Sequence, residues 1–366
     1  MPRPTDYRID GLAGLSPRRI LLCQQRQIGD VILLTPTIHL LKTRFPEAEI
    51  EVLTEKKCAP VLLHNPEVAH VWELDRGLGF LESLKFYRRV GTGGGRGRYD
   101  LIIDFQQLPR IRWVLALSDC PVKLSYPPPW YNRPFYTHWA PVSGPYAAKC
   151  KAGVVLHAFG LTWTNEPARV TLTEAERNSA GELLASWGVT PQDTLVTVDA
   201  THRRATRIWP LAHYAQLLFA AWQARPDLKF LLLYGPGEME EARPLLTQAV
   251  QTGLPAERIL LAPRQTELRE VPAILTHVGL HLGNDSSPRH FALAVGTPSL
   301  VVRGGGSNAW TYPGPGHEDV ALGLACQPCG DNDCPKGHMR CLTELMPDMV
   351  LPRLLSMLER YASPKP

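Results

Sequence analysis

The sequence contains no apolar run long enough to cross a membrane, for which about 18 consecutive apolar residues are needed. Its first ten residues, MPRPTDYRID, lack the apolar segment of a secretory signal. A strong excess of either charge is also absent, because 39 Lys and Arg residues stand against 35 Asp and Glu residues, for a net charge of +4. We find no DNA- or RNA-binding signature, and so small a charge is compatible with an anionic substrate or a membrane surface. These absences predict a cytoplasmic protein that does not act on nucleic acid.

Cysteine is sparse outside one segment near the C-terminus. Four of the eight cysteines are scattered through the first 150 residues, as expected of buried thiols. The other four are crowded into residues 326–341 together with His338, and short spacings of this kind are compatible with a structural zinc site or with reduced structural thiols. We assign the segment no catalytic role. Its candidate zinc ligands are Cys326, Cys329, Cys334 and Cys341.

Apolar strand-like runs alternate with helix-like runs in two series, a pattern that predicts parallel sheets. Between the series, Thr173 to Glu176 reads T-E-A-E, a capping box that opens a helix. A chain of 366 residues exceeds what one core usually holds. We therefore predict two Rossmann-like domains, residues 1–172 and 173–345, with a last helix in residues 346–366 that packs back on the first domain. The predicted strands are residues 19–23, 50–53, 71–74 and 101–105, then 195–198, 230–233, 259–261, 278–282 and 299–302.

The segment from Gly283 to His290, G-N-D-S-S-P-R-H, lies between an apolar strand and an apolar helix, where a doubly wound sheet binds a nucleotide. Ser286 and Ser287 are expected at the helix N-terminus, where free N–H groups and the helix dipole favour a diphosphate. Asp285 is a candidate for binding a ribose hydroxyl, and His290 for a phosphate oxygen. Taken alone, this stretch is better explained by ordinary helix capping.

A second candidate site follows the first predicted strand. Gly29 permits a tight turn, and Asp30 comes directly after it. An aspartate at the carboxyl end of a parallel strand faces the crevice where substrates bind, and its carboxylate can accept a proton from an incoming hydroxyl. Helix capping is again the alternative, and on these residues alone both remain open.

Two more loops of the second series carry polar groups. Residues 199–210, DATHRRATRIWP, contain Thr201 and three arginines, of which Arg207 can hold a diphosphate in bidentate fashion. A solvated loop is the alternative. Glu238, in the strand-to-loop crossing LYGPGE, is a candidate for binding a ribose or sugar hydroxyl.

In their order along the chain, these segments resemble glycosyltransferase family 9, the bacterial ADP-heptose:lipopolysaccharide heptosyltransferases. The opening G-D-V turn, T-P pair and F-P-x-A-x-I pattern of the family appear at residues 29–31, 35–36 and 45–50. Its Y-D-L-x-I-D-x-Q strand appears at 99–106, and the Cys-rich tail ends in R-C-L at 340–342. The K-x-W-P, G-P-G-E and D-S-G-x-x-H elements correspond to 207–210, 235–238 and 285–290.

The resemblance implies an α/β protein of GT-B architecture, with two Rossmann-like domains facing a central cleft. It implies that Asp30 is the general base of an inverting transfer of heptose from ADP-L-glycero-D-manno-heptose, with no metal required for catalysis. The donor would be bound by Thr201, Arg207, Glu238, Asp285, Ser286, Ser287 and His290. The acceptor would be the inner core of lipopolysaccharide, of the Kdo-lipid A type, at the cytoplasmic face of the inner membrane, with a peripheral membrane contact. Its carboxylates and phosphates would suit Lys56, Lys57, Arg110, Arg112 and Lys149.

Three positions depart from the family pattern. Ser287 stands where the family has glycine, Arg207 replaces lysine, and residues 303–307 read R-G-G-G-S instead of G-P-T. These departures leave open a different nucleotide sugar or acceptor, or a nucleotide-sugar-binding protein without turnover.

One aromatic segment, residues 126–139 (YPPPWYNRPFYTHW), has two explanations. Trp and Tyr favour the bilayer interface, so the segment can face lipid or the acceptor. Alternatively, its rings pack beneath the loop as part of the core.

Overall fold

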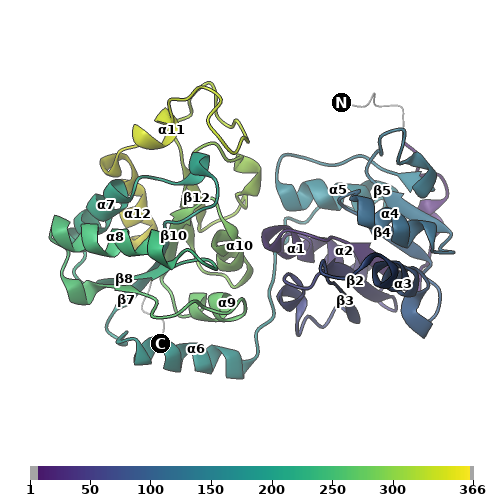
Figure 1. The fold of residues 1–366 in the computed structure, drawn as a ribbon, viewed down its shortest axis with the longest axis horizontal. Coiled ribbons are helices and arrows are strands. Elements are labelled where there is room, and N and C mark those ends of the chain that lie inside the picture. Colours follow the sequence, from purple (N-terminus) through teal and green to yellow (C-terminus); the bar gives the residue numbers. More distant parts are fainter. Residues whose placement is uncertain (1–6, 363–366) are drawn as a thin grey trace. The chain divides into compact units, whose positions relative to one another are not determined.

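The computed structural model describes residues 7–362 (Figure 1). Contacts divide the chain into two units, Met1–Thr171 and Leu172–Pro366, and each unit is built around one six-stranded sheet. The paired strands of both sheets run parallel, which confirms the predicted α/β class. Within the described residues, no helix is both long enough and apolar enough to span a bilayer.

The first sheet has the strand order β3-β2-β1-β4-β5-β6. Connections lead outwards in both directions from the central pair β1 and β4, so the loops after these two strands meet at a topological switch point. The strands are β1 (Arg19–Cys23), β2 (Glu49–Glu55), β3 (His70–Leu74), β4 (Leu101–Asp104), β5 (Val122–Ser125) and β6 (His138–Trp139). The helices are α1 (Ile28–Ile32), α2 (Thr35–Arg44), α3 (Phe80–Gly91), α4 (Pro109–Ala116) and α5 (Ala147–Phe159), with short 3-10 turns between them.

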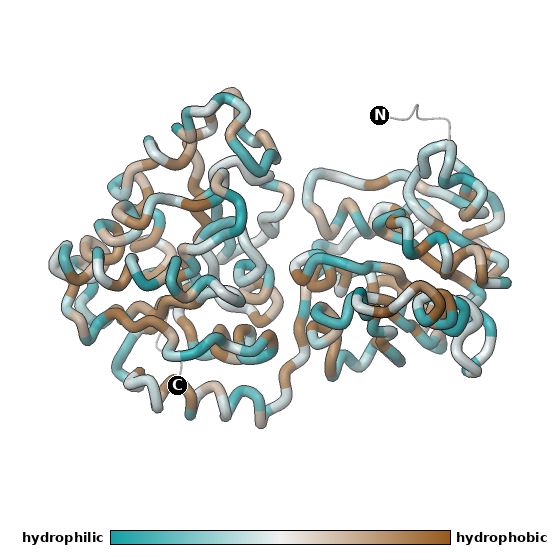
Figure 2. Tube along the Cα trace, viewed as in Figure 1, coloured by the Kyte–Doolittle hydropathy of each residue, from teal (hydrophilic) through white to brown (hydrophobic). Residues whose placement is uncertain are grey.

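The second sheet has the order β12-β11-β10-β7-β8-β9, and its switch point lies between β7 and β10. Hydrophobic residues run along β7 and β8 in Figure 2, as expected for parallel strands covered on both faces. The strands are β7 (Thr194–Asp199), β8 (Leu228–Leu233), β9 (Ile259–Leu261), β10 (Leu280–Asn284), β11 (Ser299–Val302) and β12 (His317–Val320). The helices are α6 (Glu174–Ser186), α7 (Leu211–Ala224), α8 (Met239–Thr252), α9 (Glu270–Leu275), α10 (Ser287–Ala294), α11 (Arg340–Thr343) and α12 (Pro347–Tyr361).

The helix α6 opens the second unit with the capping box predicted from the sequence. The Thr173 side chain accepts a hydrogen bond from the Glu176 backbone, and the Glu176 carboxylate accepts one from the Thr173 N–H at 2.8 Å. The helix ends at Ser186, before Gly188 at φ 82°. The unit boundary between Thr171 and Leu172 therefore lies just before a well-specified helix start.

The predicted place of the last helix is wrong. We expected residues 346–366 to pack on the first domain, whereas α12 packs on α7 and belongs to the second unit (Figure 1). Val350, Leu354, Met357 and Leu358 are buried in the core of the second sheet, and burial of these side chains holds the helix there. Residues 363–366 of the prediction lie outside the described residues.

Candidate functional site

Asp30 lies on α1, directly beyond the carboxyl end of β1. Its Oδ2 accepts the Gln27 backbone N–H at 3.0 Å, which is the expected helix cap. Its Oδ1 is 2.8 Å from the Lys151 Nζ, and the carboxylate side chain remains 21% exposed. The cap uses one oxygen only, so Asp30 combines a structural bond with a carboxylate that solvent reaches.

Lys151, on α5, was not predicted from the sequence. Besides its ion pair with Asp30, its ammonium donates to the Gln24 Oε1 at 3.2 Å. Lys149, predicted to bind the acceptor, lies two residues away on the same helix and faces a different direction, with its side chain near Gly144. No sequence signal connects Lys151 to Asp30, because only the packing of α5 beside the first switch point brings them together.

The end of β4 braces the loop that leads to Asp30. The Gln106 Oε1 accepts the backbone N–H groups of Gln25 at 2.9 Å and Arg26 at 3.1 Å. The buried Asp104 in turn accepts the Gln106 N–H at 2.9 Å and the Tyr136 hydroxyl at 2.6 Å. Burial raises the pKa of Asp104, and hydrogen bonds partly oppose that rise. The two strands of the switch point thus fix the backbone from which Asp30 projects.

The other basic acceptor candidates lie in different surroundings. The Lys57 Nζ is 3.3 Å from the Glu55 Oε2 and 3.4 Å from the Gln27 Oε1, so it reaches the Asp30 loop. The Arg112 guanidinium lies over the ring of Tyr131, 5.6 Å from its centroid. Lys56 is exposed, and Arg110 is partly buried in the first turn of α4.

Each explanation of the aromatic segment fits part of it. Tyr136 and Trp139 are buried in the core of the first unit, whereas Trp130 is 81% exposed and Tyr131 53%. The core explanation holds for the end of the segment, and the exposed rings form a surface beside Arg112.

In the second unit, the predicted diphosphate site is at the start of α10. Ser286 is the N-cap residue and Ser287 is the first helical residue. The Ser286 hydroxyl donates to the carboxylate of Asp199, at the end of β7. Burial raises the pKa of Asp199 to about 7, and the negative charge of Glu238 adds to the rise. A titratable acid therefore lies directly beneath the helix N-terminus.

Asp285 lies between two guanidinium groups. Its side chain is only 3% exposed, and its two oxygens pair with Arg207 at 3.0 Å and Arg289 at 2.9 Å. The carboxylate therefore holds these guanidinium groups in place, and its predicted bond to a ribose hydroxyl stays a prediction.

Arg207 and Arg289 belong to a chain of alternating charges. Arg289 also pairs with Asp319 at 2.9 Å, and Asp319 pairs with Arg303 at 3.0 Å. Three guanidinium groups against two carboxylates leave one positive charge in this chain. That excess favours an anion, in agreement with the diphosphate prediction for Arg207. Arg289 was missed because its partner Asp319 is far from it in the sequence. Its other partner, Asp285, is one helical turn away, and the sequence alone does not show that the two side chains meet.

The remaining donor candidates are also placed at this edge of the sheet. The Glu238 Oε2 accepts the Thr201 hydroxyl at 2.7 Å and the Gly235 N–H at 3.2 Å. His290 is buried on α10, edge-on to the Trp310 ring at a centroid distance of 6.0 Å. Thr201 and Glu238 are thus brought together, as their common assignment to the donor requires.

The loop at residues 303–307, which differs from the family pattern, contains three consecutive glycines. Close contacts explain them. A Cβ at Gly306 would lie 2.1 Å from the Asp285 Oδ2, and one at Gly305 would lie 2.7 Å from the Cys329 Sγ. A Cβ at Gly304 would lie 2.4 Å from the Thr206 carbonyl oxygen. The loop is therefore packed between Asp285, the turn that carries Arg207 and the Cys-rich segment.

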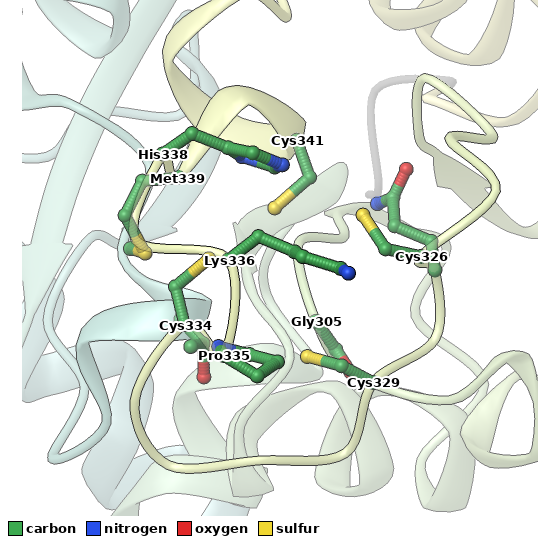
Figure 3. Close-up of a pocket in the computed structure, with 11 residues that line it drawn as sticks. Gly305, Cys326, Cys329, Cys334, Pro335, Lys336, His338, Met339 and Cys341 are labelled. Carbon is green, nitrogen blue, oxygen red and sulfur yellow. The ribbon is translucent and has the colours of Figure 1, made fainter.

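All four cysteines of that segment line one small cavity together with His338 and Lys336 (Figure 3). Within residues 7–362, no three His, Cys, Asp or Glu side chains lie close enough together in the structure to hold a metal ion. The predicted zinc site thus stays a prediction.

Comparison with known proteins identifies the family. A model of glycosyltransferase family 9 (heptosyltransferase) matches residues 88–340. Lipopolysaccharide heptosyltransferase 3 of Escherichia coli K12 is 25% identical over 297 residues, which are 79% of this chain and 83% of that protein. A family 9 glycosyl transferase from Veillonella parvula superposes with a TM-score of 0.77 at 20% identity, over 93% of this chain and 97% of its own. E. coli ADP-heptose lps heptosyltransferase II gives a TM-score of 0.73 at 18% identity, over 93% and 99%.

These structures share the GT-B fold, which confirms the predicted architecture of two Rossmann-like units. The family match covers more than half of the chain. The chain therefore belongs to glycosyltransferase family 9, the heptosyltransferases.

Proposed function

We propose that this chain transfers heptose from ADP-L-glycero-D-manno-heptose to the inner core of lipopolysaccharide, with inversion at the anomeric carbon. The observation that carries the proposal is Asp30, a partly exposed carboxylate held at the first switch point by the Gln27 N–H and the Lys151 ammonium. The donor is taken from the heptosyltransferase relatives, one of which is named for ADP-heptose.

In this proposal Asp30 removes the proton from the attacking acceptor hydroxyl. As that oxygen forms its bond to the anomeric carbon, the bond from this carbon to the β-phosphate oxygen breaks, and ADP leaves with the electron pair. A single displacement of this kind inverts the configuration. General-base catalysis by a positioned carboxylate contributes about 10²- to 10⁴-fold to the rate.

The leaving ADP needs compensating positive charge. Arg207, held by Asp285 at 3.0 Å, and the free N–H groups at the start of α10 would supply it. Thr201 and Glu238 would bind hydroxyls of the donor. Because fixed cationic groups meet the diphosphate, we propose that the transfer itself needs no metal ion.

The acceptor would be an anionic saccharide on a lipid. Lys57 is joined to the Asp30 loop through Gln27, so it is the basic candidate best placed to bind a carboxylate or phosphate of the acceptor. The exposed rings of Trp130 and Tyr131 beside Arg112 would rest on the cytoplasmic face of the inner membrane.

The proposal is tested by measuring heptose transfer from ADP-heptose to a panel of truncated lipopolysaccharide cores by mass spectrometry. The wild type is compared with Asp30→Asn, which can still accept the Gln27 N–H but cannot take a proton. We expect a heptose mass increment for the wild type and a rate at least about 100-fold lower for the variant. The affinity for ADP, measured by calorimetry, should not change.

Asp75→Asn is the matched control, because the Asp75 carboxylate also accepts a backbone N–H, from Gly77 at 2.7 Å. Its transfer rate should equal that of the wild type. If the wild type transfers heptose and Asp30→Asn transfers it equally fast, Asp30 is not the base. Binding of ADP-heptose without transfer to any core would favour another acceptor or a protein without turnover. Binding of other nucleotide sugars, with no binding of ADP-heptose, would mean that the donor is one of those sugars instead.

A further inference from the structure

We infer that Cys326, Cys329, Cys334 and Cys341 bind one thiolate-preferring transition metal ion, zinc or iron, and that this ion fixes the loop beside Arg207. The inference goes beyond the proposed function, because it concerns a site that takes no part in the transfer step.

The donor set has the chemistry of such a site. Four thiols from one short stretch of chain line the same cavity (Figure 3), and thiolate sulfur is the ligand that selects zinc or iron over the harder divalent ions. The turn after Cys334 is closed by a hydrogen bond from the Gly337 N–H to the Cys334 carbonyl at 3.0 Å, and it contains Gly337 at φ 70°, a conformation that favours glycine.

Simple packing does not account for the four thiols. Cys341 is buried in the core of the second unit, but Cys326, Cys329 and Cys334 are only partly buried. They lie in residues 321–339, which contain no helix or strand. A segment of this length without a helix or strand needs another source of order, and metal binding contributes directly to folding free energy in such segments.

The cavity already accommodates positive charge. Figure 3 shows the Lys336 side chain extending among Cys326, Cys329 and Cys341. In the present arrangement of side chains, no three metal-ligating residues within 7–362 lie close enough together to hold an ion. Binding therefore requires the Lys336 side chain to leave and the thiols to turn inward, and Lys336 is exposed and can leave.

The Cys-rich segment is joined to the donor site by hydrogen bonds. The Gln327 Nε2 donates to the Gly304 carbonyl at 2.8 Å, and the Gly330 N–H donates to the Gly305 carbonyl at 2.9 Å. The Thr206 hydroxyl donates to the Asp331 carbonyl at 2.7 Å. Thr206 precedes Arg207, so an ion that orders the segment also orders the turn that carries this guanidinium.

The test begins with the metal content of the full chain. The protein is produced with an affinity tag that contains no His or Cys, in medium supplemented with zinc and iron, and is purified under reducing conditions. Elemental analysis should find about one zinc or iron ion per chain, and a visible spectrum distinguishes iron from zinc. Cys329→Ser and Cys334→Ser should each lose the ion, whereas Cys120→Ser, in the core of the first unit, should keep it.

A second measurement does not depend on the variants folding. Wild-type protein stripped with a chelator is titrated with Co²⁺ and should develop a thiolate-to-cobalt charge-transfer band with the visible bands of a tetrahedral site. The affinity for ADP of stripped protein should be at least about fivefold weaker than that of reloaded protein.

Fewer than about one ion per ten chains together with no cobalt band would overturn the metal site, and so would disulfides among the four cysteines of the isolated protein. Equal ADP affinities with and without the ion would overturn the link to Arg207. Neither outcome depends on transfer activity, so failure of the proposed function is recognised separately.

Discussion

The two switch points share one strand order but differ in charge and burial. Beyond β1, a single carboxylate is partly exposed and paired with one ammonium, Lys151. Beyond β10, a chain of three guanidinium groups and two carboxylates lies around the start of α10, and its central pair, Asp285 and Arg289, is buried. In the proposed function, the same topology serves proton transfer in one unit and anion binding in the other, and the residues after the strands decide which.

Replacing Arg207 tests the anion-binding half of this comparison most strongly. Arg207→Ala removes one positive charge and leaves the buried Asp285 paired only with Arg289 among the ion pairs described. We expect ADP binding to weaken about 100-fold, because a charged hydrogen-bond partner of this kind contributes about 1.5–3 kcal/mol. Calorimetry with ADP measures the change.

The control for this prediction is Arg207→Lys, which keeps the charge but loses the planar fork. It should recover part of the affinity. Unchanged ADP affinity in Arg207→Ala, with the fold retained by circular dichroism, would move the diphosphate away from this switch point.

Substitutions of Lys151 and Lys149 test the other half of the comparison, which is the proposed role of Asp30 at the first switch point. Lys151→Met removes the ammonium partner of Asp30, and we expect kcat for heptose transfer to fall about tenfold with little change in the affinity for ADP. Lys151→Arg should restore much of the rate, because the positive charge returns. Steady-state kinetics with a saturating donor measures kcat for both variants.

Lys149→Met is the matched control, since it removes the same group two residues away on α5. It should leave kcat within about twofold of the wild type, because residues two apart on a helix point in different directions. Equal losses in both variants would mean that the net charge of α5 matters and not the ion pair.

The second switch point should also respond to pH. The Asp199 pKa is raised by burial to about 7, so the folded protein binds a proton there that the unfolded chain releases above its ordinary pKa. The stability of the wild type relative to Asp199→Asn should therefore fall as pH rises from about 4 to about 7, by up to about 4 kcal/mol, and stay level above that. Urea unfolding across this range measures it.

The same ionisation should be visible in donor binding. A negative charge on Asp199 beneath the start of α10 opposes a diphosphate, so ADP affinity should fall about two- to fivefold between pH 6 and pH 8. Asp199→Asn should show a smaller change. An identical pH profile in both proteins would remove Asp199 from the donor site.

The sequence predicted the fold better at its centre than at its edges. The predicted strand at residues 19–23 has the bounds of β1, because a parallel strand buried on both faces is a continuous apolar run. The outer strands β5, β6 and β12 were missed, since they have only two to four residues and β12 is partly exposed along its length.

The site was predictable where neighbours in the sequence make it and hidden where packing makes it. Asp30 and Arg207 lie in the segments that follow β1 and β7, so the alternation of strands and helices placed them at the switch points. Lys151 reaches Asp30 from α5, and Arg289 reaches Asp319 on β12, through contacts that no local pattern encodes. The sequence also does not show that two guanidinium groups pair with Asp285.

The place of α12 bears on how hybrid enzymes can be built. Because this helix remains with the second sheet, each unit is one uninterrupted stretch of chain that meets the other at Thr171 and Leu172. Two homologous genes joined at that codon would exchange the whole second unit for another without dividing a helix or a sheet. In the proposed function, the specificities for donor and acceptor could then be recombined at this one position.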